Sequence, residues 1–174
     1  MSDDRTGFDA PDAQANGADT APAAGMISQY VKDLSFENPN APAIYQVQGN
    51  APRMDVGFNI GSTQVAPDVH EVVLKIEVRA EIDGGQVAFV VDLAFAGLFG
   101  FRNIPAEHMQ PFLLGEAPRL LFPFARRVIA DAVRDGGFPP LLLDPIDFHA
   151  AYQQQQGQGQ GQVGDIDIQG LGNA

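Results

Sequence analysis

The residue types that most often carry catalysis or bind metals are few and scattered in this sequence. No two of the three histidines, His70, His108 and His149, have the spacing of three or four residues that would bring them together on one helix. Cysteine is absent, which excludes disulfides, thiolate catalysis and cysteine-based zinc sites. We therefore expect no metal site and no cofactor. A pair of carboxylates that meets in space for acid–base catalysis stays an open alternative.

Three short patterns look like catalytic or ligand-binding motifs but lack the surroundings that such motifs need. Ser28, Ser35 and Ser62 lie outside a G-x-S-x-G elbow. Residues 159–164 fit the dinucleotide pattern G-x-G-x-x-G, yet they lie in a Gln/Gly stretch with no predicted strand before them. Residues 165–170, DIDIQG, begin like a calcium loop, but no acid follows where such a loop has its bidentate ligand. We accordingly expect the protein not to be an enzyme.

Carboxylates are the main polar feature of the chain. The 22 acidic residues outnumber the 10 basic ones, which gives a formal net charge of -12. Arg126 and Arg127 form the one adjacent basic pair, so the sequence offers no basic patch for nucleic acid. The N-terminus is acidic where a signal peptide is basic, and no apolar run reaches the length of roughly 20 residues that spans a bilayer. We expect a cytoplasmic protein that does not insert into membranes.

Composition divides the chain into a core and two polar ends. Residues 1–25 are rich in Asp, Ala, Pro and Gly, and they offer too little apolar surface to offset the entropy of ordering. Residues 155–174 are rich in Gln and Gly. The sequence therefore predicts a disordered extension over 1–25, one folded domain over 26–154 and a flexible tail over 155–174.

Apolar and polar residues alternate in four successive segments, which is the pattern of half-buried strands. They are residues 31–37, 52–60, 69–82 and 86–99. The sequence Asp-Gly-Gly at 83–85 predicts a tight turn, so the last two segments should form an antiparallel hairpin.

After the strands the period changes to that of a helix. Residues 118–137 place an apolar stripe on one side, with Pro118 in the first turn and Gly136 and Gly137 at the C-terminal cap. A shorter helix precedes this segment, and a last helix should start near Asp144 or Asp147. Strands followed by helices predict an α+β fold, in which C-terminal helices pack on one face of a four-stranded antiparallel sheet.

Two of these strands carry acid on one face. In an extended segment Leu34 and Phe36 point to one side, and Asp33 and Glu37 point to the other. Prolines follow this segment, so it should be an edge strand. Asp92 is the one charge in an otherwise apolar strand, and it should either reach solvent or mark a contact site.

Aromatic residues near the ends of the elements fit core packing or a groove for extended peptide, and the pattern leaves both open.

Several blocks of this sequence resemble the SecB family of bacterial protein-export chaperones. They are KDLSFENPNAP at 32–42, EVVLKIEV at 71–78, and LFPFARRVIADAVRDGGFPPLLLDPIDF at 121–148, followed by the Gln-rich stretch. The resemblance covers residues 28–155 in order. The long acidic N-terminus and the Gln/Gly tail depart from the family in length.

The resemblance implies a chaperone that holds unfolded precursor proteins in an export-competent state and delivers them to the SecA ATPase of the Sec pathway. It also implies a homotetramer built as a dimer of dimers, with a basic, zinc-carrying tail on the ATPase. The positions that would bind SecA are Asp33, Glu37, Val90 and Asp92. The positions that would bind unfolded clients are Met54, Val56, Phe58 and Phe148. The positions that would form the tetramer interface are Val91, Leu93 and Phe95.

Two other functions compete with this one. A SecB-like chaperone dedicated to one client, such as a toxin–antitoxin component, would share the fold, although Asp33, Glu37 and Asp92 favour the ATPase-linked role. A small-ligand binding protein could use the same groove, and it would have no affinity for unfolded proteins.

Overall fold

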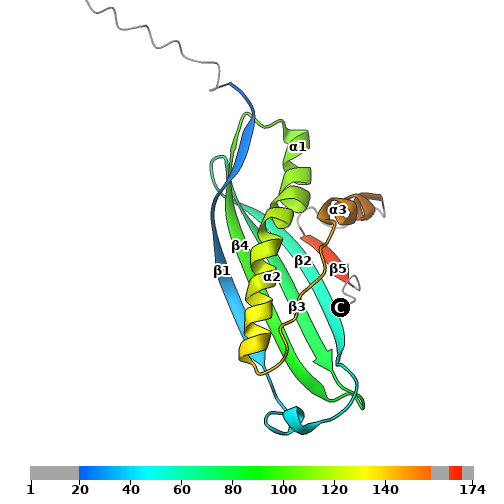
Figure 1. Cartoon of the computed structure of the whole chain (residues 1–174). Coiled ribbons are helices and arrows are strands. Elements are labelled where there is room, and N and C mark those ends of the chain that lie inside the picture. Colours follow the sequence, from blue (N-terminus) through cyan, green and yellow to red (C-terminus); the bar gives the residue numbers. More distant parts are fainter. Residues whose placement is uncertain (1–19, 158–164, 170–174) are drawn as a thin grey trace, which may run out of the picture.

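The computed structural model describes residues 20–157 and 165–169, and their centre is one antiparallel sheet. Its four long strands are β1 (Ala23–Glu37), β2 (Arg53–Ala66), β3 (Val69–Glu81) and β4 (Val87–Arg102). A short fifth strand, β5 (Asp165–Gln169), pairs with β2 along the edge of β2 that does not pair with β3. The order across the sheet is β1-β4-β3-β2-β5 (Figure 1). The four predicted strands are confirmed: β1 is longer than predicted, β2 and β4 extend further at their C-terminal ends, and β3 ends one residue earlier.

The helices of the described residues lie on one face of this sheet, as expected for the α+β class (Figure 1). They are α1 (Ala106–Pro111), a single π-helical turn η3 (Phe112–Glu116), α2 (Ala117–Asp135) and α3 (Phe148–Gly157). A 3-10 turn, η2 (Ala43–Gln46), connects β1 to β2. We call the helix-covered side of the sheet the inner face and the opposite side the outer face.

The ends of the helices follow the sequence signals. Pro118 lies in the first turn of α2, which continues directly from the π-helical turn η3, and α2 ends just before Gly136. A side chain at position 136 would overlap the ring of Phe36, so glycine is needed there for close packing against β1. The last helix starts one residue after Asp147, whose carboxylate accepts a hydrogen bond from the Ala150 N–H at 2.9 Å.

Hairpin turns set the order of the three central strands. Gly84 and Gly85 adopt φ of 88° and 79° between β3 and β4, in the region that glycine enters without steric cost. Asp68 takes φ of 57° in the tight connection between β2 and β3. The predicted Asp-Gly-Gly turn is therefore confirmed.

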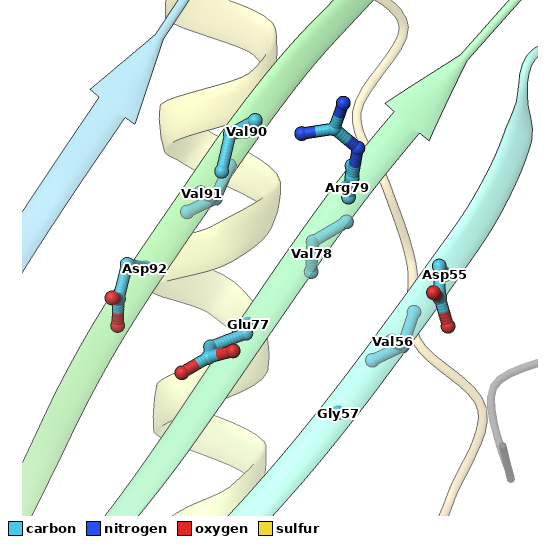
Figure 2. A pocket seen from close by; sticks show the side chains of 9 residues that line it. All are labelled: Asp55, Val56, Gly57, Glu77, Val78, Arg79, Val90, Val91 and Asp92. Atoms are coloured by element: carbon cyan, nitrogen blue, oxygen red, sulfur yellow. The ribbon is translucent and has the colours of Figure 1, made fainter. Parts of the chain in front are cut away.

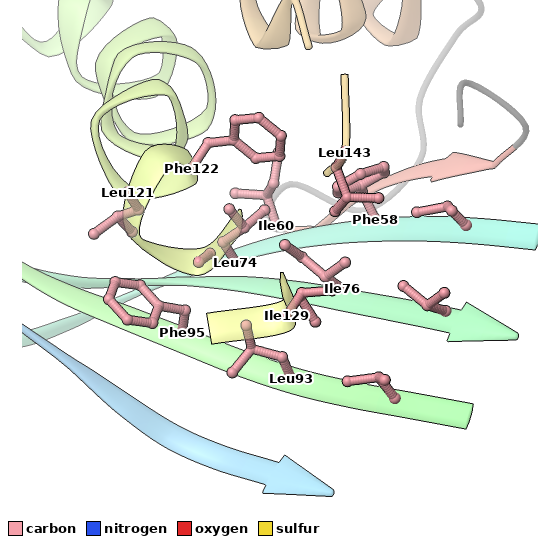
Figure 3. Close-up of a cluster of buried hydrophobic side chains, with 14 of the residues drawn as sticks. Phe58, Ile60, Leu74, Ile76, Leu93, Phe95, Leu121, Phe122, Ile129 and Leu143 are labelled. Carbon is pink, nitrogen blue, oxygen red and sulfur yellow. The ribbon is translucent and has the colours of Figure 1, made fainter. Parts of the chain in front are cut away.

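The hydrophobic core fills the space between α2 and the inner face (Figure 3). Alternate residues of the sheet point into it, and Leu121, Phe122 and Ile129 of α2 pack onto them. Each fully buried side chain of this size contributes about 1.5–3 kcal/mol. Because the side chains of a strand alternate, burying one set fixes its neighbours on the outer face. The core-facing residues of the sheet include Phe58, Ile60, Leu74, Ile76, Leu93 and Phe95.

Strand β1 is an edge strand, as the sequence predicts, and it is irregular. It pairs with β4 alone among the described strands, with register shifts between Met26 and Ser28 and between Val31 and Asp33. Large apolar side chains are exposed along it, which is uncommon on an edge open to solvent. They are Met26, Ile27, Tyr30, Val31 and Leu34.

The ends of the chain differ in part from the expected division. Strand β1 begins at Ala23, before the predicted domain boundary at residue 26. The segment predicted as a flexible tail, 155–174, contributes the last turn of α3 and all of β5. The calcium-loop pattern falls largely on β5, whose backbone is paired as a strand, and the G-x-G-x-x-G pattern at 159–164 lies outside the described residues.

Candidate functional site

The outer face carries a group of carboxylates from four adjacent strands. Antiparallel pairing places Glu37 opposite Val90 and Ser35 opposite Asp92, so these residues share one face. On the far side of β4, Glu77 lies opposite Asp92. Figure 2 shows Asp55, Glu77 and Asp92 projecting from the side of the sheet turned away from α2. We call the set Asp33, Glu37, Asp55, Glu77 and Asp92 the acidic face.

The centre of the acidic face is a shallow hollow of about 410 Å³ between β2, β3 and β4. Val90 gives it an apolar patch, two residues from Asp92 on β4 and opposite Arg79 of β3 (Figure 2). Arg79 also borders the hollow, but its Nε donates to Glu81 at 2.7 Å, and this hydrogen bond lowers the pKa of Glu81. The basic group is thus already paired, while across residues 20–157 and 165–169 no ion pair involves a member of the acidic face.

One carboxylate on the outer face is satisfied within the fold. Glu71 of β3 accepts a hydrogen bond from Lys32 Nζ at 2.6 Å and one from Tyr30 Oη at 2.5 Å. The hydrogen bond from Lys32 and, to a smaller extent, that from Tyr30 lower the pKa of Glu71. The hydrogen bond between Tyr30 and Glu71 also raises the pKa of Tyr30. Both partners come from β1, so Glu71 ties the edge strand to β3 across β4. Among the described residues, the outer-face carboxylates without an ion pair are therefore those of the acidic face, and Lys75 of β3 lies on the same face, also without one.

The structure brings the four predicted SecA-binding residues, Asp33, Glu37, Val90 and Asp92, onto one surface. Sequence reasoning missed Asp55 and Glu77, which extend that surface over β2 and β3. Their signal was present, because both occupy the polar positions of alternating strands. The register that puts them beside Asp92 depends on the hairpins and could not be read from either segment alone.

On the inner face an aromatic cluster joins β2 to the helices. The Phe148 ring packs edge-on against Phe58 and Phe122, with centroids 6.5 and 5.7 Å apart. Phe148 is 1% exposed, and Phe58 and Val56 are 2% exposed. Met54 is half-buried at the start of β2. Three of the four predicted client-binding residues are therefore covered, and Phe148 of α3 is one of the side chains that cover Phe58.

A charged contact fastens α3 beside this cluster. Glu116 in η3 accepts hydrogen bonds from Arg119 Nη2 and Nε at 2.5 and 2.8 Å, and His149 Nε2 lies 3.3 Å from it. The hydrogen bond from Arg119, with a smaller contribution from His149, lowers the pKa of Glu116 to about 2. Apart from this contact, α3 is anchored by few buried side chains, mainly Phe148 and Ala151. So small a set of anchors makes α3 a candidate for local release from the core.

The predicted tetramer contacts need a correction. Val91 and Leu93 are 0% exposed and Phe95 is 5% exposed, because α2 covers the inner face of β4 within the same chain. These side chains cannot reach a second subunit. The alternating pattern separated the two faces of β4 correctly, but it did not indicate which face the chain's own helix covers.

The described residues contain neither a cluster of His, Asp or Glu fit to hold a metal nor a helix long and apolar enough to cross a membrane.

Comparisons with known proteins agree with the fold and cover most of the chain. The family model described as preprotein translocase subunit SecB matches residues 17–159. The protein-export protein SecB of Sphingopyxis alaskensis is 62% identical over 156 residues, which cover 89% of this chain and 90% of that protein. The protein-export protein SecB of Rhizorhabdus wittichii is 62% identical over 146 residues, which cover 84% and 87%.

A solved structure has the same fold at low sequence identity. It is a SecB-like chaperone of Mycobacterium tuberculosis in complex with a ChAD peptide from an antitoxin. The TM-score is 0.60 at 19% identity, and the match covers 71% of this chain and 90% of that one. With the family match spanning well over half of its length, the chain belongs to the SecB family of protein-export chaperones.

Proposed function

We propose that this chain works in the cytoplasm, where it holds unfolded precursor proteins in an export-competent state and delivers them to the SecA ATPase. The observation that carries the proposal is the placement of two different surfaces on opposite sides of one sheet. The acidic face lies on the outer side, and the apolar cluster under α3 lies on the inner side. A chaperone with this arrangement can contact client and ATPase at the same time.

The acidic face is proposed as the SecA contact. A basic tail on the ATPase would meet five carboxylates that have no ion-pair partner within the described residues. Charge complementarity of this kind sets association rate and specificity, and it weakens as salt rises. Val90 supplies an apolar contact at the centre of the face.

The client site is proposed to open when α3 leaves the sheet. Release of α3 would expose Phe148 and the part of Phe58 that it covers, and Val56 and half-buried Met54 would continue this apolar row along β2. Unfolded chains expose aromatic residues and backbone rather than one defined sequence, so an apolar surface without fixed polar partners suits many of them. Holding then follows from mass action and needs no catalytic step, because bound unfolded chain is withdrawn from folding.

A homotetramer built as a dimer of dimers is proposed to use β1. The exposed apolar side chains of this strand give a partner subunit a surface that the buried residues of β4 do not offer. Light scattering at micromolar concentration checks the oligomeric state. A monomer under those conditions would overturn this part of the proposal.

The test of the whole function is a refolding experiment. A slow-folding precursor is diluted from denaturant with and without the purified chain, and its refolding is followed by fluorescence. We expect a dose-dependent delay that ends when SecA and ATP are added. A delay that SecA cannot end would favour a chaperone dedicated to another pathway. No delay, together with saturable binding of one small metabolite, would favour a ligand-binding protein.

A further inference from the structure

The last of the described strands, β5, pairs with the edge of β2 that β3 leaves open. Five residue pairs join the two strands, from Gly57 opposite Gln169 to Gly61 opposite Asp165. Without β5, strand β2 would be the second edge of the sheet, because β3 is its other neighbour. Figure 1 shows β5 on this side of the sheet, near α3. The chain's own tail segment therefore occupies a backbone row that is otherwise available for pairing.

An open strand edge is a ready acceptor for another extended chain. Its outward N–H and C=O groups need partners, and an added strand of almost any sequence can supply them. The register places Ile166 and Ile168 opposite Ile60 and Phe58, two residues that contribute to the core. Gly57, at one end of this ladder, has open space where a Cβ would stand on the outer face of the sheet.

We propose that the outer edge of β2 is a binding site for one extended polypeptide segment and that β5 is its resident occupant, in competition with client. The competition with client rests on the proposed function, whereas the occupation by β5 does not. The site adjoins the apolar residues Val56 and Phe58 of the same strand. A client segment paired to this edge would continue directly onto the surface that α3 covers.

The pairing of β5 with the outer edge of β2 should be substantial but reversible. A five-residue ladder is short, and the net gain from its hydrogen bonds is close to the entropy lost on ordering the segment. Residues 158–164 connect Gly157 to Asp165, and a tether of this length gives an effective concentration on the order of 1 mM. If the free segment binds with a dissociation constant of about 0.1–0.5 mM, the tail should weaken client binding by roughly threefold to tenfold.

Two proline variants of the full-length chain test the site. Successive N–H groups of a strand point to opposite sides, so one of Ile166→Pro and Asp167→Pro must remove a ladder hydrogen bond to β2. Gln160→Pro, outside the strand, is the matched control. The readouts are hydrogen exchange of the β2 amides and calorimetry with two probes. One probe is a synthetic peptide of residues 163–172, and the other is a carboxymethylated, permanently unfolded protein.

At least one proline variant should exchange its β2 edge amides faster than the wild type and the control. It should also bind both probes about threefold to tenfold more tightly. Unchanged exchange in both variants would show that β5 does not occupy the edge and would overturn the proposal. Faster exchange with unchanged affinity for the peptide would overturn the edge as a binding site. The proline variants could bind the peptide more tightly while neither they nor the wild type bind the unfolded protein. That result would uphold the edge site and refute the proposed chaperone function instead.

Discussion

Reversal of one charge on the acidic face should weaken SecA binding by an amount that follows from Coulomb's law. Asp92 is exposed at the centre of this face, between Ser35 and Glu77 of the neighbouring strands. An exposed pair of unit charges about 5 Å apart in water attracts with about 0.8 kcal/mol. Asp92→Lys turns one such attraction into a repulsion, so the unscreened change is about 1.6 kcal/mol.

Salt sets how much of this change is measured. With Debye lengths of about 30, 8 and 3 Å at 0.01, 0.15 and 1 M salt, the expected loss of affinity is about tenfold, fivefold and less than twofold. The assay is calorimetry of SecA with the wild type and Asp92→Lys at these three salt concentrations. Because the substituted side chain faces solvent, thermal unfolding should move little.

Asp144→Lys is the matched control. It changes the net charge by the same amount, but Asp144 lies in the segment between α2 and α3 rather than on the acidic face. Its affinity for SecA should stay within twofold of the wild type. Equal losses in both variants would mean that total charge alone matters. An unchanged affinity of Asp92→Lys at 0.15 M salt would refute the assignment of the outer face as the SecA contact.

Three further changes test other parts of the structure. Phe148→Ala should weaken the packing of α3 on the core by about 3–5 kcal/mol, which should appear as faster amide exchange throughout that helix. Amides that stay protected in the variant would contradict the role of Phe148 as the anchor. Glu116 has a folded pKa near 2, below its ordinary 4.5, so its stabilisation is present above pH 4.5 and is lost as pH falls toward 2. Glu116→Gln should therefore lower the free energy of unfolding by about 1 kcal/mol at pH 7 after solvent screening, and by less at pH 3. Chemical unfolding at the two pH values measures this, and equal losses would refute the charged contact. Leu34→Asp should reduce the assembly mass in light scattering, and an unchanged mass would exclude that part of β1 from the interface.

The strands and their two faces could be predicted from the sequence, because alternation over many residues has one physical meaning. The placement of Asp33, Glu37 and Asp92 on a common face follows from that alternation once the register is known. The missing information was which face the helices cover. Val91 and Leu93 show the consequence, since either side of a strand that is apolar on both sides could have met α2.

Strand β5 was missed for a different reason. The segment 165–169 is short and follows a Gln/Gly stretch, so its local pattern has little weight against the surrounding composition. Its pairing depends on the free edge of β2, a feature of the folded sheet rather than of the tail. The covering of Phe58 by Phe148 is likewise tertiary, because those residues are far apart in the sequence.

The two register shifts in β1 bear on how copies of this protein associate. A flat apolar edge would let strands stack on one another without limit, as in fibres. Bulges bend and twist the strand, so the backbone row of β1 is interrupted near Met26 and again near Val31. Growth by repeated strand addition is thereby blocked, while the apolar side chains between the interruptions remain free to meet a matching surface. An export factor that must keep other chains from aggregating thus carries its own protection against fibre formation.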